Sequence, residues 1–307
     1  MLAVNPDPVV ACRLLREVLR VPAGDPEMIE VKETAQRSKW VRQLEQSQLP
    51  DGSWGRFHTQ DAKKKTAFRT TEEAVDRAAA MGLEPGEGVL KRLSLYCEHI
   101  LRGEAQISDW YEKNESFPVL IQYIVAGRLA QIDPASNTLT SYWEFLTEVA
   151  RRAFSSGVYN LHDEAEAFLQ LSGVHVRGGF LESQHALWIL SSRKLPESLE
   201  LAFVSWIWRK PDGIRYIRSP LAHLQPHRIG FWLRSMNILS RFPSWRTLAH
   251  GSLVELWEQR DKDGSWDFGS SIAGCVEFPI SESWRQPDKR RQDFSTHILV
   301  LLRKYFD

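Results

Sequence analysis

One short motif occurs twice in the sequence, and this repetition constrains the fold more than any other feature. Asp-Gly-Ser-Trp spans residues 51–54 and again 263–266, and Gln46 and Gln259 lie a few residues before the two copies. Each copy follows an amphipathic helical run and precedes a polar loop and a second, apolar helical run. Such recurrence is typical of proteins that are built from repeated helix pairs.

The rest of the chain alternates in the same way between helical runs and loops that carry Gly, Asp or Trp. The spacing is about 40 residues, which is typical of two-helix repeats. The pattern predicts an all-α chain with one domain over residues 1–307, in which residues 1–26 form an N-terminal helix and linker. Helix pairs that close on themselves would form a ring, whereas a linear solenoid needs polar caps, and the N-terminal helix suits either arrangement.

Helix boundaries follow from hydrophobic periodicity and from Gly and Pro breakers. One helix is expected over residues 28–47 and the last one over residues 294–305, after a long loop that ends at Arg291. The apolar run 117–132 is expected to be buried on more than one side. Residues 165–171 carry no clear pattern.

Composition excludes several classes of protein. The chain has 39 Lys+Arg and 39 Asp+Glu, and this zero net charge argues against a nucleic-acid partner on a broad basic surface. The 3 cysteines lie far apart without a disulfide or zinc-type spacing, so a reducing cytoplasm is expected. Residues 9–21 are too short and too charged to span a membrane. The 12 Trp indicate repeat-locking turns, an aromatic pocket, or both.

The helix, Gln and Gly-x-Trp pattern resembles the QW motif of squalene-hopene cyclases and related terpenoid cyclases. The β-subunits of protein prenyltransferases use the same fold, an α/α toroid. The resemblance implies a single toroid, a barrel of about five to six outer–inner helix pairs. It also implies that Gln46 and Gln259 hydrogen-bond a neighbouring helix start while Trp54 and Trp266 stack on it, so these residues would be structural.

The Asp-x-Asp-Asp acid motif of the cyclases is absent from this sequence. At the matching helix start the chain carries Glu72 and Glu73, and Asp109 follows in a later loop. Protonation of an alkene needs a carboxylic acid that is kept protonated in a dry pocket. Glu72, Glu73 and Asp109, with Glu182 and His185, are therefore the predicted catalytic residues. Charges that stabilise a helix N-terminus and a histidine of the core are the alternative interpretation.

Aromatic residues from different helical runs are predicted to line a cavity. Such a cavity holds an apolar chain and stabilises carbocations through ring faces. Packing between helices is the alternative for each residue. The predicted substrate-binding residues are Trp110, Tyr123, Trp188, Phe231 and Trp232. Two basic clusters, residues 63–65 and 289–291, are expected in equivalent loops, where they would bind phosphate or an anionic membrane surface.

Metal binding is a weaker prediction. Cys275, Glu277 and His297 carry the residue types of a prenyltransferase zinc site but not its Asp-x-Cys spacing. The acidic stretch 162–166 matches no known ligand pattern. No cofactor or metal ligand is predicted, and Mg²⁺ and Zn²⁺ remain open.

The sequence thus leads to three alternative functions. The first is a terpenoid-cyclase-like enzyme that cyclises an isoprenoid by acid- or carbocation-driven chemistry. The second is a non-catalytic toroid that binds a lipid or a peptide, and the third is a zinc-dependent prenyltransferase-like protein. An isoprenoid or another hydrophobic small molecule is the expected partner. Peripheral contact with a membrane is a further expectation, and nucleic acid is not a predicted partner.

Overall fold

A computed structural model describes residues 5–59, 67–107, 109, 116–176, 178–271 and 279–307. Within these ranges the chain is helical and contains no strand, apart from one isolated bridge between Ser183 and Arg215. The all-α prediction is confirmed. None of the described helices has the length and apolar character needed to cross a membrane.

The helices follow one another along the whole chain. In order they are α1 (Pro8–Arg13), α2 (Pro26–Gln36), α3 (Lys39–Ser47), α4 (Thr71–Ala80), α5 (Gly88–Leu101), α6 (Phe117–Ile132), α7 (Thr140–Ala153), α8 (Leu161–Ser172), α9 (Gln184–Leu190), α10 (Glu197–Arg209), α11 (Ile229–Leu239), α12 (Trp245–Glu258) and α13 (Pro287–Phe306). Short helical segments η2 (Leu14–Val18), η3 (Asn137–Leu139) and η4 (Pro226–Arg228) extend α1, α7 and α11.

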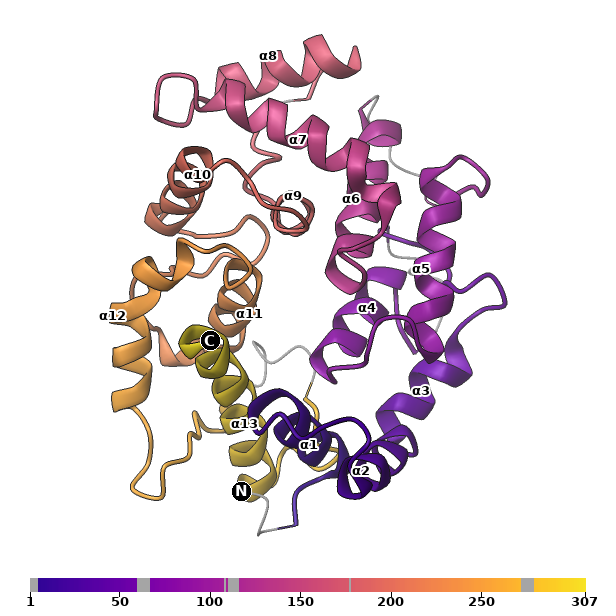
Figure 1. Ribbon diagram of the computed structural model, residues 1–307, viewed down its shortest axis with the longest axis vertical. Helices are drawn as coiled ribbons and strands as arrows, with labels where there is room; N and C mark the ends of the chain where they lie inside the picture. Colours follow the sequence, from indigo (N-terminus) through magenta and orange to yellow (C-terminus); the bar gives the residue numbers. More distant parts are fainter. Residues whose placement is uncertain (1–4, 60–66, 108, 110–115, 177, 272–278) are drawn as a thin grey trace.

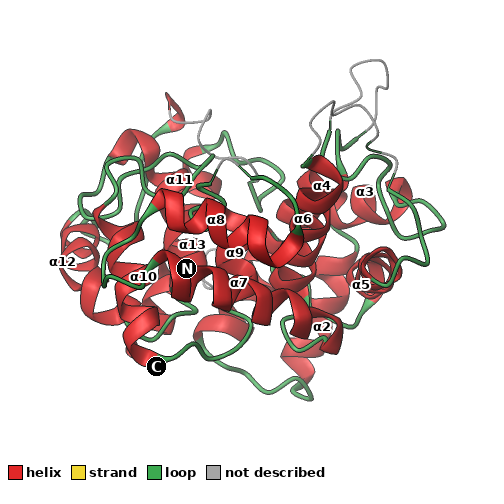
Figure 2. Cartoon of the chain, turned by 90° about the horizontal axis from the view of Figure 1, so that it is seen from above, coloured by secondary structure: helices red, strands yellow, loops and turns green. Residues whose placement is uncertain are grey.

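The helices form two sets (Figures 1 and 2). We call α4, α6, α9, α11 and α13, which lie toward the middle in Figure 1, the inner helices, and α3, α5, α7, α10 and α12, toward the periphery, the outer helices. Along the inner set, α4 contacts α6, α6 contacts α9, α9 contacts α11, and α11 contacts α13. An inner helix therefore follows each outer one along the sequence from α3 to α13, except that α8, which belongs to neither set, lies between α7 and α9.

The N-terminal helix connects the two ends of the inner set. α1 packs against α13, and its last residue, Arg13, reaches α4. There the Nη1 atom donates a hydrogen bond to the Ala80 carbonyl at 2.8 Å, and the same atom lies 3.1 Å from Nδ1 of His297 on α13. α1 therefore contacts both α4 and α13, the first and the last of the inner helices.

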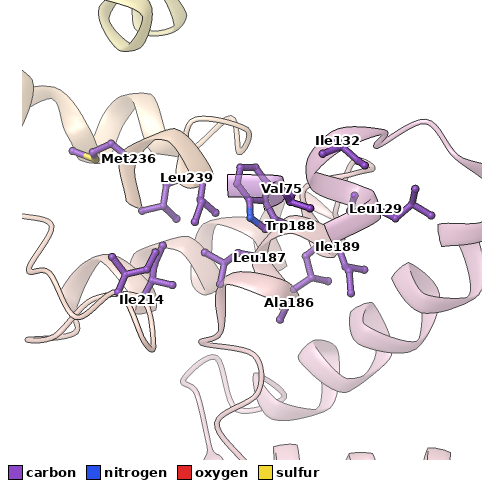
Figure 3. Close-up of a cluster of buried hydrophobic side chains, with 14 of the residues drawn as sticks. Val75, Leu129, Ile132, Ala186, Leu187, Trp188, Ile189, Ile214, Met236 and Leu239 are labelled. Atoms are coloured by element: carbon purple, nitrogen blue, oxygen red, sulfur yellow. The ribbon is translucent and has the colours of Figure 1, made fainter. Parts of the chain in front are cut away.

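The most enclosed inner helix is α9. All of its residues are buried, and Leu187, Ile189 and Leu190 have no exposed surface. Its side chains pack between α6 and α11, with Trp188 in the middle of the cluster (Figure 3). A helix that is apolar on all sides must be surrounded by other helices, which explains its central position.

The two Asp-Gly-Ser-Trp turns make the same set of hydrogen bonds. The indole N–H of Trp54 donates to the Leu44 carbonyl of α3 at 3.1 Å, and that of Trp266 donates to the Leu256 carbonyl of α12 at 2.8 Å. Both tryptophans are buried. In each turn the Ser N–H and hydroxyl both bond to the Asp carboxylate. Each turn thus satisfies a carbonyl at the end of an outer helix.

Each turn is also fastened to the next inner helix. The backbone N–H of Trp54 donates to the Thr71 hydroxyl of α4, and that of Trp266 donates to the Ser295 hydroxyl of α13, both at 3.0 Å. The tryptophans therefore link an outer helix to an inner one through hydrogen bonds, in the structural role that the sequence predicts.

The glutamine of the first copy differs from the prediction. Gln48, not Gln46, makes the connection, because its amide N–H donates to the carbonyls of Gly52 and of Val89 in the first turn of α5. Gln48 directly follows the last residue of α3 and has extended backbone angles, whereas Gln46 lies within the helix.

Two predicted boundaries are wrong. The run 28–47 is two helices, because Ser38 is extended and its hydroxyl accepts the N–H of Val41 as an N-cap. The last helix begins at Pro287, so residues 289–291 lie in α13 and not in a loop. The stretch that carries no clear pattern belongs to α8.

Candidate functional site

The inner helices and α1 meet at one pocket, which we call the central pocket. Its volume is about 160 Å³. Both polar and apolar side chains line it. Its polar lining is Arg13, Asp76, Gln131, Arg234, Asn237 and His297, and its apolar lining includes Ala79, Ala80, Trp188, Leu233, Phe294, Val300 and Leu301.

A network of buried charges crosses the molecule beside this pocket. The Arg128 guanidinium of α6 donates to Glu72 at 2.8 Å and to Asp76 at 2.6 Å, both on α4. Asp76 also accepts a hydrogen bond at 2.8 Å from Arg234 of α11, which donates to Gln184 of α9 at 2.7 Å. Charged side chains therefore join α4, α6 and α11, and the Gln184 amide extends the network to α9. Arg128 and Glu72 are buried, whereas Asp76 and Arg234 are partly exposed.

Glu72 is ionised in this network. Burial alone would raise the pKa of its carboxyl, but Arg128, His185 and His58 outweigh burial and hold that pKa well below its usual range. The prediction of a protonated carboxylic acid at this position is not supported, because a carboxylate paired with arginine has no proton to donate at neutral pH. Burial alone would also raise the pKa of Asp76, but the charges of Arg128 and Arg234 outweigh burial and lower that pKa.

His58 is a site residue that the sequence analysis missed. Its Nδ1 atom is hydrogen-bonded to the second carboxylate oxygen of Glu72. Burial alone would lower the pKa of His58, but the hydrogen bond to Glu72 and its charge raise that pKa. An imidazole that a carboxylate holds through Nδ1 is an arrangement suited to proton transfer at the other ring nitrogen. No motif marks this residue in the sequence.

Asp109 acts on the backbone around His58. Its carboxylate accepts the N–H groups of Phe57 at 2.7 Å and of His58 at 2.8 Å, and also the Thr59 hydroxyl at 2.8 Å. The carboxylate is buried and has several donors, which is the role of an anchor for the loop. The structure thus places Asp109 on the backbone of the loop that carries His58 and shows what it binds.

His185 lies on the other side of Glu72. Its Nε2 atom is 3.4 Å from the Glu72 carboxylate, and burial lowers its pKa to about 3, so the imidazole is neutral. Its backbone packs against Gly127 of α6 so closely that a Cβ atom there would lie 2.8 Å from the His185 Cα. Gly127 therefore lets α6 and α9 approach each other at the level of the charged network.

The two other predicted catalytic carboxylates do not join this group. Glu73 accepts the Arg69 N–H at 2.7 Å, and its own N–H bonds to the Thr70 hydroxyl, so it caps α4. Glu182 is half-buried and pairs with Lys210 at 2.6 Å. The alternative interpretation, charges that stabilise a helix terminus, describes Glu73.

Of the predicted aromatic lining, Trp188 borders the central pocket. Tyr123 packs with Tyr142, Phe145, Phe168 and Phe180 in a separate aromatic cluster of α6, α7 and α8. The buried Trp232 indole donates to the Leu221 carbonyl at 3.1 Å, and Phe231 lies under the Arg228 guanidinium. These three residues pack helices and loops together. Trp110 lies outside the described residues.

The basic and metal-ligating candidates are dispersed. Residues 63–65, Cys275 and Glu277 lie outside the described residues. On α13, Lys289 pairs with Asp7 and Arg290 with Asp267. In the acidic stretch of α8, Glu164 accepts the N–H groups of Phe180 and Leu181. In the part of the chain that the structure describes, no three His, Cys, Asp or Glu side chains gather as metal ligands would.

Comparisons with protein-family models, with curated proteins and with solved structures found no match to this chain. The central pocket and the charged network beside it are therefore the basis for a functional proposal.

Proposed function

We propose that the protein is a single α/α toroid that binds a small organic molecule in the central pocket. The observation that carries this proposal is that α1 and every inner helix contribute to the lining of one pocket. Ligand sites in helical proteins commonly lie where several helices face one another. The contact between Arg13 and Ala80 supports the same reading, because it connects the two ends of the inner set.

The size of the pocket favours a small ligand. A volume of about 160 Å³ is close to that of a cavity of about 150 Å³ that holds a benzene-sized molecule, and below the roughly 300–1,000 Å³ of typical drug-sized sites. The ion pair between Arg234 and Asp76 spans from α11 to α4 and fills space that a long chain would need. A polyprenyl chain fits this interior poorly, whereas a molecule of six to ten heavy atoms, roughly, fits it well.

A terpenoid-type enzyme is the second candidate. It is favoured by the paired Asp-Gly-Ser-Trp turns, in which each tryptophan bonds to an outer helix and to the next inner helix, and by the indole of Trp188 on the pocket wall. The ionised state of Glu72 argues against it as the proton donor. His58 is the better candidate for that role, because the hydrogen bond to Glu72 and its charge raise the pKa of the imidazole; His58 lies beside the charged network and is not among the residues that line the pocket.

A ligand screen with a pocket-filling variant tests the proposal. Leu233 is partly buried and lines the pocket, so Leu233→Trp would fill it, and Leu248→Trp on α12 is the matched control at a partly buried position outside it. We expect benzene-sized molecules to raise the melting temperature of the wild type and of Leu248→Trp but not of Leu233→Trp. Equal responses of all three proteins would contradict binding in this pocket.

The same samples separate the two candidates. Squalene and polyprenyl diphosphates are incubated with the wild type, and the mixture is read by mass spectrometry. A binding protein returns its ligand unchanged, whereas a new cyclic product that Leu233→Trp does not form would establish the enzyme.

A further inference from the structure

Three cations lie at the end of the central pocket where α4, α6 and α11 finish. Arg13 lines this end, and Lys304 of α13 donates to the side-chain oxygen of Asn237, another lining residue. The Arg241 guanidinium lies over the ring of Trp188, 4.3 Å from its centroid. Arg13 thus lines one end of the pocket, and Lys304 and Arg241 lie behind it in contact with lining residues.

The negative charge at this end is smaller. Arg13 is paired with Glu17 by two hydrogen bonds of 2.8 and 2.9 Å. Arg241 donates to the carbonyls of Ala130 and Gln131, both at 2.8 Å, and Lys304 to an amide oxygen. Within the described residues neither Arg241 nor Lys304 forms an ion pair with a carboxylate. Two cations are therefore balanced only by partial charges.

This imbalance destabilises the charged state of Lys304. Burial and the charges of Arg13 and Arg241, against the attraction of Glu17, together lower its pKa to about 8. A partly buried cation without a counter-ion costs free energy that a bound anion restores. Lys304 also remains partly exposed, so a solute reaches it.

We propose that this end of the central pocket binds the carboxylate or phosphate group of a small ligand, with Lys304 as its principal contact. The inference rests on the proposed function, since it assigns the chemistry of the same ligand. The remaining lining includes Leu233 and Leu301, which would hold a short hydrocarbon part. The ligand class is therefore a small amphipathic anion.

Thermal shift and calorimetric titration of the full chain test this inference. The probes are inorganic phosphate, acetate and butyl phosphate, each against potassium chloride at the same ionic strength. We expect phosphate or acetate to raise the melting temperature beyond the chloride control. Butyl phosphate should bind at least about tenfold more tightly than phosphate, because its chain buries apolar surface.

Two lysine variants provide the contrast. Lys304→Met should raise the dissociation constant of butyl phosphate at least about tenfold, whereas the exposed Lys194→Met should leave it unchanged. Without ligand, Lys304→Met should melt at a higher temperature than the wild type, because it removes repulsion from Arg13 and Arg241. A purely structural role in bonding Asn237 predicts the opposite, a lower melting temperature.

The possible results distinguish failure of the anion site from failure of the proposed function. Loss of anion binding in both Lys304→Met and Leu233→Trp supports the inference. Anion binding that Lys304→Met does not weaken, or no response beyond chloride in the wild type, overturns it. If neutral benzene-sized molecules still bind and Leu233→Trp abolishes that binding, the proposed function stands while the anion site does not.

Discussion

The two Asp-Gly-Ser-Trp copies share their turns but not the inner helices that follow them. Trp54 is fastened to Thr71 and Trp266 to Ser295, so these hydroxyl residues occupy equivalent positions. Counting from them, Glu72 corresponds to Thr296 and Asp76 to Val300. At these positions the first inner helix carries the buried Glu72 and the partly buried Asp76, whereas the second carries the uncharged Thr296 and Val300.

This difference distinguishes the repeated turns, which have a structural role, from the residues that line the central pocket. The turns repeat because each must satisfy the same carbonyl and attach the same kind of inner helix. The inner faces differ because α4 and α13 border the same pocket from different sides, one charged at Asp76 and the other apolar at Val300 and Leu301. Chemistry specific to this protein lies where the copies diverge.

The largest effect is expected from removing the arginine that pairs with the carboxylates of α4. Arg128→Met leaves Glu72 and Asp76 buried without their shared cation, which costs about 3–5 kcal/mol of unfolding free energy. Urea denaturation measures this loss. The control Arg151→Met breaks exposed ion pairs with Glu148 and should change stability by less than about 0.5 kcal/mol. A similar small effect of both changes would contradict the network.

Two glycine variants should distinguish the two turns, which otherwise make the same hydrogen bonds. Gly52 and Gly264 both have positive φ, of 93° and 82°. A Cβ atom on Gly52 would lie 2.4 Å from the Arg92 carbonyl oxygen, whereas one on Gly264 would meet nothing within 4 Å. We expect Gly52→Ala to destabilise by about 3 kcal/mol and Gly264→Ala by about 1 kcal/mol in thermal unfolding. Equal losses would show that α5 does not pack on the first turn as described.

Substitutions of the two turn tryptophans should reduce stability by similar amounts. Trp54→Phe and Trp266→Phe each remove an indole donor and leave a buried carbonyl, of Leu44 or Leu256, without that partner. Each should lose about 1–2 kcal/mol, and the two values should agree within about 0.5 kcal/mol. A difference above about 1 kcal/mol in urea unfolding would mean that the two copies are not energetically equivalent.

The last comparison concerns pH. Burial lowers the pKa values of His185 and His297 to about 3, so both are neutral in the fold, whereas the unfolded chain protonates them below about pH 6.5. Unfolding therefore takes up protons, and stability falls as pH drops from about 6.5 toward 3, by about 1.4 kcal/mol per pH unit for each histidine. The raised pKa of His58 acts in the opposite direction, and its contribution is lost as pH rises through that pKa.

A single substitution on α13, the inner helix after the second copy, isolates the contribution of one histidine to this pH dependence. His297→Gln keeps an acceptor for Arg13 and removes the titration, so it should reduce the slope of unfolding free energy between pH 6 and 4, roughly, by about 1.4 kcal/mol per unit. The exposed His162→Gln is the control. Parallel slopes for the wild type and His297→Gln would contradict a buried neutral imidazole.

Local pattern predicted the helices and the repeated turns because both depend on nearby residues. The run of α6 and the structural role of Trp54 and Trp266 belong to this class. The break at Ser38 was not predicted, because the residues on both sides continue the same helical periodicity.

The charged network could not be predicted, because its partners are far apart in sequence. Arg128 is separated from Glu72 by 56 residues, and Arg234 from Asp76 by 158. One signal was present: Arg128 is the sole charged residue in the apolar run of α6, and such a residue needs a buried partner. Glu72 was singled out for its place at a helix start, but its ionised state depends on that distant arginine.

The most direct test of a pocket lined by both charged and apolar side chains is a crystal structure of the full chain with butyl phosphate. The account predicts electron density in the central pocket, with the phosphate within hydrogen-bond distance of Lys304 and the hydrocarbon against Leu233 and Leu301. A central pocket without ligand, beside butyl phosphate bound elsewhere on the molecule, would contradict it.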